Sequence, residues 1–148
     1  MARKNKTTVP KQPWDIRYFR RHREDDPKQR APVQEFRQVC PIGVRAEIDA
    51  TLQAVAEAPP PMFAGGLRWK PMHGDMAGWF EVRVKGPERR LYRVFCLLER
   101  KGEGLRGPSI VLIDGMWKSN ETAFSERDYA RIRRLGAEYR ARTPRSVI

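Results

Sequence analysis

Three successive segments of the chain decide its fold: Trp79-Phe-Glu-Val-Arg-Val-Lys85, Leu91-Tyr-Arg-Val-Phe-Cys-Leu-Leu-Glu99 and Ser109-Ile-Val-Leu-Ile-Asp114. All three are rich in β-branched and aromatic residues, and turn signals such as Gly86-Pro87 and Gly107-Pro108 separate them. In the first segment apolar residues alternate with charged ones, which places the two kinds on opposite faces of a strand. We therefore expect three strands in a small sheet with one buried apolar face and one charged face.

The residues before these strands predict a further strand and two helices. Apolar and polar residues alternate over 14–19, which predicts a short strand. Apolar residues at helical spacing predict helices over 32–40 and 44–57. Pro59 and the two residues after it have the composition that ends a helix.

The remaining residues predict a loop and a last helix. Residues 63–78 contain several glycines and no clear period, so we expect a loop. Ser125 followed by Asp128 fits a capping box, which predicts a helix over 125–142. The expected order is β-α-α-β-β-β-α, an α+β domain whose helices pack against one face of a mostly antiparallel sheet.

Composition along the chain predicts one structured domain. Residues 1–13 are polar and basic, and we expect a disordered arm. Residues 14–142 contain the predicted elements and are long enough for a single domain with a core of its own. Residues 143–148 are expected to form a tail.

The net charge of the chain is +12 and it is distributed unevenly. Residues 1–30 carry ten Lys or Arg against four Asp or Glu, a net +6, whereas residues 31–67 carry a net −2. Residues 68–124 and 125–148 each carry a net +4. The positive charge therefore belongs to the arm, the predicted sheet and the last helix, and it predicts an acidic partner, of which nucleic acid is the commonest.

Several classes of protein do not fit the sequence. Cys40 and Cys96 stand alone in apolar patterns without a C-x-x-C motif or a Cys/His cluster, so neither a disulfide framework nor a metal site is expected. No apolar run approaches the roughly 18 residues that span a membrane, and the basic N-terminus lacks the apolar segment of a signal peptide. We expect a cytoplasmic protein without a cofactor and without a membrane partner.

Cations and aromatic residues are interleaved on and around the charged face of the predicted sheet. Phosphates bind Arg and Lys while bases stack on aromatic rings, so such a surface suits single-stranded nucleic acid. The candidate RNA-binding residues are Arg83, Lys85, Arg89, Arg90, Arg134, Trp69 and Trp117. For each of them alone, a solvated cation or a ring at the edge of the core is an alternative.

The same region contains groups that can catalyse RNA cleavage. The 2′-hydroxyl of RNA is a nucleophile, so an enzyme needs to move protons and to neutralise the phosphorane, for which arginine is well suited. The candidate catalytic residues are Arg93, His73, Lys70 and Lys118. Glu81 and Asp114 are the carboxylates placed to act as a base.

Six short motifs, taken in order, resemble the RelE/ParE toxin superfamily and its HigB-like, phage-derived branch. The motifs are Pro32-Val-Gln-Glu-Phe36, Val44-Arg-Ala-Glu-Ile48, Trp69-Lys-Pro-Met-His-Gly74, Trp79-Phe-Glu-Val-Arg83, Leu91-Tyr-Arg-Val-Phe95 and Leu112-Ile-Asp-Gly-Met-Trp-Lys118. The resemblance implies the toxin of a type II toxin–antitoxin system, an mRNA endoribonuclease that needs no metal and acts at the ribosome. It also implies a cognate antitoxin, expected to be of the helix-turn-helix type, and the ribosome and mRNA as partners.

The resemblance also assigns positions. The family's phosphate-contacting arginine corresponds to Arg93, and its basic residue in the preceding strand corresponds to Arg83. The HigB-like active-site loop corresponds to the segment from Lys70 to Gly74. The sequence departs from the family where RelE has two lysines and here has Glu81 and Arg83, and Tyr129 reads as a core residue and not as the family's catalytic tyrosine.

A second interpretation stays open beside the endoribonuclease. The superfamily includes ParE-type inhibitors of gyrase, and fold alone does not determine activity. The chain can equally be a non-catalytic binding module, either a gyrase inhibitor or a domesticated RNA-binding homologue. In that case the same cations provide affinity only.

Overall fold

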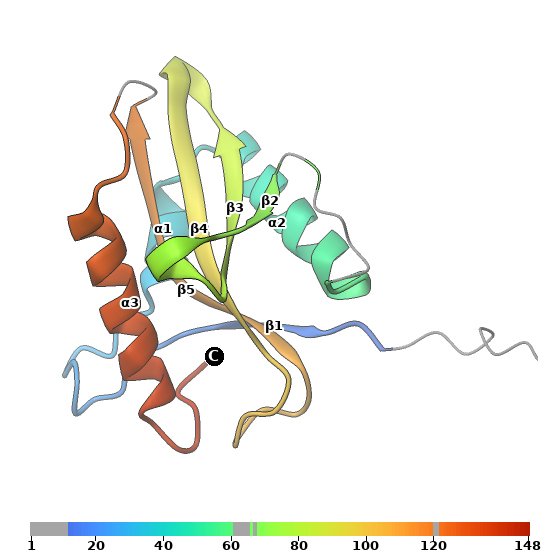
Figure 1. Cartoon of the computed structure of the whole chain (residues 1–148), viewed down its shortest axis with the longest axis vertical. Coiled ribbons are helices and arrows are strands. Elements are labelled where there is room, and N and C mark those ends of the chain that lie inside the picture. The colour runs from blue at the N-terminus through green and yellow to red at the C-terminus, as the bar shows by residue number, and fades with distance from the viewer. Residues whose placement is uncertain (1–11, 61–65, 67, 120–121) are drawn as a thin grey trace, which may run out of the picture.

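The structure is a computed structural model of the chain and describes residues 12–60, 66, 68–119 and 122–148. It confirms an α+β fold, with helices packed on a mostly antiparallel sheet (Figure 1). The helices are α1 (Pro32–Val39), α2 (Ile42–Glu57) and α3 (Glu126–Arg140), and the strands are β1 (Asp15–Tyr18), β2 (Trp69–Pro71), β3 (Trp79–Lys85), β4 (Arg90–Glu99) and β5 (Ser109–Ser119). Two short 3-10 helices are η1 (Gly74–Met76) and η2 (Pro87–Arg89). The predicted arm lies outside the described residues except for its last two positions.

The sheet has the strand order β1-β5-β4-β3-β2. The strands β2 to β5 pair antiparallel because each follows its neighbour through a short connection. Strand β1 pairs parallel with β5. Along the chain, α1 and α2 lie between β1 and the next strand, β2. The predicted three-strand unit is therefore the centre of a five-stranded sheet.

The segment expected to be a loop over 63–78 contains an edge strand, so that expectation is wrong for part of its length. Strand β2 pairs with β3 through Trp69↔Val82 and Lys70↔Glu81, and η1 follows it. A strand of three residues is too short to show a period in the sequence, and Pro71 is tolerated because β2 lies at the edge. Residues 63–65 and 67 lie outside the described part of the chain.

Helices cover both faces of the sheet, which corrects the expectation of a single covered face (Figure 1). Helices α1 and α2 pack on one face around buried residues such as Ile48, Val94 and Leu112. Helix α3 packs on the other face around Phe95, Ile113 and other buried side chains. The alternating pattern did not reveal the second core because the second face is apolar over only part of its length.

Helix α3 begins as predicted. The Ser125 hydroxyl accepts a hydrogen bond from the Asp128 backbone N–H at 3.2 Å, and the Asp128 carboxylate accepts one from the Ser125 backbone N–H at 2.8 Å. The rings of Phe124 and Tyr129 stack with centroids 6.4 Å apart, which completes the hydrophobic staple. These contacts fix the first turn of α3 beside the sheet.

A β-bulge interrupts the pairing of β4 with β5. The register shifts between Phe95 and Cys96 on β4, opposite Ile113 on β5. Ile113 and Asp114 therefore both face α3: Ile113 lies in the core beneath that helix, and the Asp114 carboxylate is 3.5 Å from Arg131 Nε. Bulges of this kind re-aim side chains.

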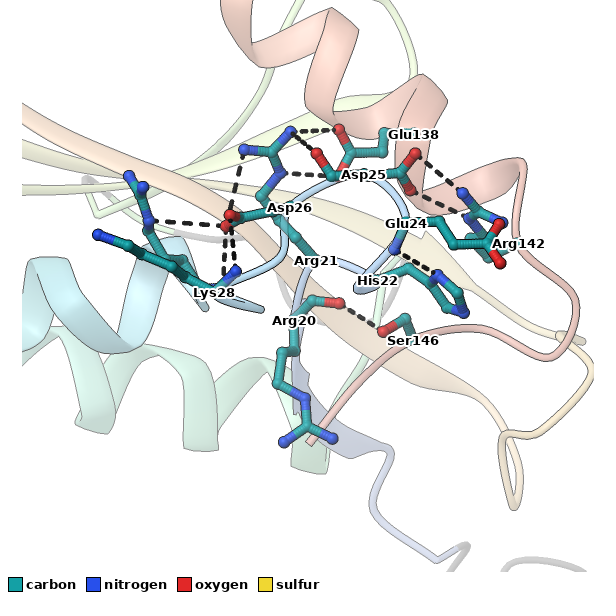
Figure 2. A network of polar contacts seen from close by, with 11 residues as sticks. Arg20, Arg21, His22, Glu24, Asp25, Asp26, Lys28, Glu138, Arg142 and Ser146 are labelled. Carbon is teal, nitrogen blue, oxygen red and sulfur yellow. Dashed lines mark hydrogen bonds and ion pairs between the residues drawn. The ribbon is translucent and has the colours of Figure 1, made fainter.

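Ion pairs fasten the loop between β1 and α1 to the C-terminal part of the chain (Figure 2). Arg21 donates to both carboxylate oxygens of Glu138 at 2.8 and 2.9 Å, and Arg142 donates to both oxygens of Asp25 at 3.0 and 2.9 Å. The charged blocks of this loop therefore pair mainly with α3 and the residues after it, and not only with each other. The expected tail also packs on the domain, because Val147 forms a bridge with Phe19.

The structure also describes the two cysteines and the lengths of the helices. Cys40 and Cys96 are both buried free thiols, and burial raises the pKa of each. None of the helices in the described residues has the length and apolar composition needed to cross a membrane.

Candidate functional site

Helix α3 covers only part of its face of the sheet. It lies closest at Gly136, where a Cβ atom would be 2.5 Å from the Trp79 ring, so only glycine fits this crossing. Toward the other end of β3 and β4 the same face carries Glu81, Arg83 and Arg93. The charged residues of the predicted sheet therefore lie beside the start of α3, where Glu81 and Arg93 are largely buried and Arg83 is partly exposed.

A pocket of about 460 Å³, which we call the loop pocket, lies between this charged end and η1. Its polar lining comes from four elements or loops: Lys70, His73, Asp75, Glu81, Arg83, Glu126 and Tyr129. The segment before β3 thus brings Lys70 and His73 beside Arg83, as the sequence predicted. His73 is exposed at the start of η1, where its backbone carbonyl accepts a hydrogen bond from Met76.

A larger hollow of about 880 Å³, which we call the edge groove, runs between α2 and the ends of β3 and β4. Lys70 and Arg83 line both the edge groove and the loop pocket, so the two hollows adjoin at these side chains. The edge groove adds Arg68, Lys85 and Arg93. Within the described part of the chain, Lys70, Arg83 and Lys85 form no ion pair with a carboxylate, whereas Arg68 is 3.0 Å from Glu47.

Arg93 is held in place by its neighbours. Its guanidinium donates to the Glu81 carboxylate at 3.2 Å and lies 4.6 Å from the centroid of the Phe124 ring. The side chains of Arg93 and Glu81 are only 14% and 9% exposed. The Nε of Arg93 is buried and has no hydrogen-bond partner among the described residues. Arg93 is therefore a largely neutralised, rigid cation beneath the site.

Lys118 lies on the same face but is paired. Its ammonium group is 3.2 Å from the Asp128 carboxylate and 5.9 Å from the Phe124 ring centroid. The Ser125 backbone N–H and Lys118 together hold the pKa of Asp128 below its ordinary value. Lys118 is not among the residues that line the loop pocket or the edge groove.

Arg90 and Trp117 form a separate group next to the turn between β3 and β4, and Arg89 lies in that turn. The Arg90 guanidinium lies 4.2 Å from the Trp117 ring centroid and 3.2 Å from Glu88, and Trp117 is 41% exposed. Trp117 pairs across the sheet with Tyr92, which belongs to the core beneath α1 and α2. This group therefore lies on the opposite face from Arg93 and Lys118.

Two predicted RNA-binding residues lie elsewhere. Trp69 is 2% exposed and stacks on Phe80 with centroids 5.1 Å apart, so it is a core residue and the prediction of base stacking is wrong for it. Its position at the covered face of an edge strand, which the sequence analysis did not identify, explains the burial. Arg134 lines a different pocket on the other flank of α3.

Tyr129 and Arg68 also line the two hollows, although neither was predicted as a site residue. Tyr129 was interpreted as core only, yet it both packs on Phe95 with centroids 6.3 Å apart and lines the loop pocket. Its position at the fourth residue of a capped helix beside the sheet was the available signal. Arg68 precedes a strand that was not recognised, so nothing in the sequence placed it beside the edge groove.

The arrangement can bind an anionic, extended ligand and can move protons. Lys70 and Arg83 can contact successive phosphates because they lie where the two hollows meet. His73, Tyr129 and Glu81 are groups that can donate or accept protons beside them. Among the described residues, no three His, Cys, Asp or Glu side chains are grouped so that they can hold a metal ion.

Comparisons with known proteins add no relative. No family model, no curated protein and no solved structure matches the chain.

Proposed function

We propose that the protein is the toxin component of a type II toxin–antitoxin system, and that it cleaves mRNA at the ribosome without a metal. The observation that carries the proposal is the convergence of Lys70 and Arg83, which have no carboxylate partner in the described part of the chain, with His73, Glu81 and Tyr129 in one pocket. The family resemblance of the sequence supports the same conclusion. The proposed setting is the cytoplasm, with ribosome, mRNA and an antitoxin as partners.

The proposed reaction uses the 2′-hydroxyl of the RNA. A base takes the 2′-hydroxyl proton, O2′ forms a bond to phosphorus, and the bond from phosphorus to O5′ breaks as an acid protonates O5′. The products are a 2′,3′-cyclic phosphate and a 5′-hydroxyl end. Arg83 and Lys70 neutralise the phosphorane, while His73, Tyr129 and Glu81 are the candidates for the proton transfers.

Arg83→Ala is the sharpest test of this site. Arg83 is partly exposed and forms no ion pair in the described residues, so its loss leaves no buried charge behind. Removing one such phosphate contact is expected to reduce cleavage by about 100-fold or more. The measurement is the mapping of mRNA 5′ ends after induction without the neighbouring genes, with purified variants compared by thermal unfolding.

Arg140→Ala is the matched control, because Arg140 is an exposed arginine of α3 that lines neither hollow. It should retain full cleavage. Full toxicity and unchanged 5′ ends in a folded Arg83→Ala variant would show that the site assignment is wrong.

The ion pair between Arg93 and Glu81 favours the second candidate function, a non-catalytic binding module. An arginine already neutralised by Glu81 contributes less to a developing negative charge than a free one. A binding module predicts RNA or protein affinity that falls steeply with salt, but no new 5′-hydroxyl ends. A gyrase inhibitor predicts DNA damage on induction with intact mRNA.

A further inference from the structure

A second pocket lies on the other flank of α3, between that helix, α1 and β5. Its volume is about 510 Å³, and Asp114, Arg131 and Arg134 are among its lining residues. We call it the α1-side pocket. These three residues line neither the loop pocket nor the edge groove, and the volume is in the range of small-molecule sites.

Asp114 has an unused hydrogen-bond acceptor. The residue is 1% exposed, and its Oδ1 accepts a hydrogen bond from the Gly115 backbone N–H at 2.9 Å. Its Oδ2 is buried and has no hydrogen-bond partner in the described residues. Burial raises the pKa of Asp114, although Arg131 and the Gly115 N–H oppose this rise. A buried acceptor without a donor is unfavourable, so the site lacks a donor that a ligand can supply.

Two arginines on one side of α3 line the pocket together with this carboxylate. Arg131 Nε is 3.5 Å from Asp114 Oδ2, and the Arg131 side chain is 56% exposed, so it can turn outward and admit a ligand. Arg134 is one helical turn further along, is exposed, and forms no ion pair within the described part of the chain. Two neighbouring guanidiniums of this kind suit a phosphate group.

Three charged lining residues of the pocket, Arg21, Arg30 and Glu138, already form ion pairs. Arg21 is held by Glu138 at 2.8 Å and by Asp26 at 3.8 Å, and Arg30 is 3.6 Å from Asp26 (Figure 2). These pairs leave Arg131, Arg134, Asp114 and the exposed carboxylate of Glu35 as the ionic lining groups that are available to a ligand. A simple anion would leave Asp114 without a donor, and a simple cation would be repelled by both arginines.

We propose that the α1-side pocket binds a phosphorylated ribose, either in a free nucleotide or at the 5′-phosphorylated end of an RNA. Arg131 and Arg134 bind the phosphate, and a ribose hydroxyl donates its hydrogen bond to Asp114 Oδ2. Carboxylates commonly bind ribose hydroxyls in this way. The proposal does not rest on the ribonuclease function, because no residue is shared with that site.

The test is calorimetric titration of the whole protein with adenosine 5′-monophosphate and with its 2′,3′-dideoxy analogue. We expect saturable binding of the ribonucleotide, and binding about tenfold weaker for the analogue, since a hydrogen bond to a charged group is lost. Arg134→Ala should weaken the ribonucleotide about tenfold. Asp114→Asn should abolish most of the preference for the ribose hydroxyls while the protein stays folded.

Controls and a second pair of ligands complete the experiment. Arg140→Ala should leave the affinity unchanged, because Arg140 does not line the α1-side pocket. A tetraribonucleotide with a 5′-phosphate, compared with one bearing a 5′-hydroxyl, distinguishes an RNA end from a free nucleotide. The proposal is overturned if neither ligand binds, if both adenosine compounds bind equally, or if Arg140→Ala weakens binding as much as Arg134→Ala.

Discussion

The two faces of the sheet are both covered by helices, but they differ in what the helices bury. Beneath α1 and α2 the core consists of apolar side chains, and the buried polar residue of α2, Thr51, carries no charge. Beneath α3 an apolar region around Phe95 and Ile113 adjoins buried carboxylates, Glu81 and Asp114, each paired with an arginine. The face that looks polar in the sequence is therefore a second core with charged residues at its ends, and pockets occur at those ends.

The comparison is tested most strongly by two neighbouring core residues. Leu112 faces α1 and α2, Ile113 faces α3, and neither is exposed. Replacing either by alanine should lower the free energy of unfolding by about 2–5 kcal/mol, because a buried aliphatic side chain is lost and a cavity remains. Urea unfolding measures both. A loss below about 0.5 kcal/mol for Ile113→Ala alone would mean that the α3 face is not a core.

The next effect concerns the buried ion pair on the α3 face. Glu81→Ala leaves the Arg93 guanidinium, which is 14% exposed, without its carboxylate. We expect a loss of roughly 2–3 kcal/mol, somewhat less than for a fully buried pair. The double variant Glu81→Ala/Arg93→Met should recover part of this loss. If the two single changes are additive in a double-mutant cycle, the pair contributes no coupling and the charged end is not part of the core.

A smaller effect of opposite sign is expected at Asp114. Burial raises the pKa of this carboxyl, so its ionised form costs stability once the pH exceeds the folded-state pKa. Asp114→Asn should therefore stabilise the protein by roughly 1 kcal/mol at pH 7. The difference should shrink as the pH falls toward the ordinary value of 3.8. Thermal unfolding from pH 3 to pH 8 measures it, and a destabilised variant at pH 7 would contradict the prediction.

The smallest effect on stability is expected at the ion pair between Glu99 on β4 and Arg145 near the C-terminus. Burial alone would raise the pKa of Glu99, but hydrogen bonds from Arg145 and Tyr139 hold it below its ordinary value of 4.5. This stabilisation is present above pH 4.5 and is lost as the pH falls through the lowered folded-state pKa. Arg145→Lys keeps the positive charge beside Glu99 but loses the two-nitrogen contact of the guanidinium, so it should lower stability by about 0.5–1 kcal/mol at neutral pH and by less in acid. An acid midpoint unchanged from the parent protein would show that this pair does not report on folding.

Much of the fold was predictable because its signals are local. The limits of β3, the capped start of α3 and the break between α1 and α2 depend on residues within a few positions of one another. Strand β2 was not predictable, because three residues do not establish a period and their partner lies on another strand. The cover of α3 over the second face was missed because it depends on Gly136 and Trp79, which are far apart in the sequence.

The candidate site was predictable in part for the same reason. Lys70 and Arg83 lie on the adjacent strands β2 and β3, and His73 follows β2 directly before η1, so the three side chains converge as expected. The prediction for Trp69 was wrong and the place of Tyr129 in the pocket lining was missed, since an aromatic side chain on an amphipathic element can face the core, a pocket or both. Which cations are neutralised could not be read from the sequence, because the partners Glu81 and Asp128 become neighbours only in the fold.

The β-bulge beside Phe95 sets the phase of everything that follows it on β5. Because Ile113 and Asp114 both face α3, Gly115 turns toward α1, where a Cβ atom would be 2.4 Å from the Phe36 ring, and Lys118 returns to the face of α3. A one-residue deletion that removed the bulge would exchange the faces of residues 114–118 together. The single extra residue in β5 thus determines which face of the sheet each of residues 114–118 occupies.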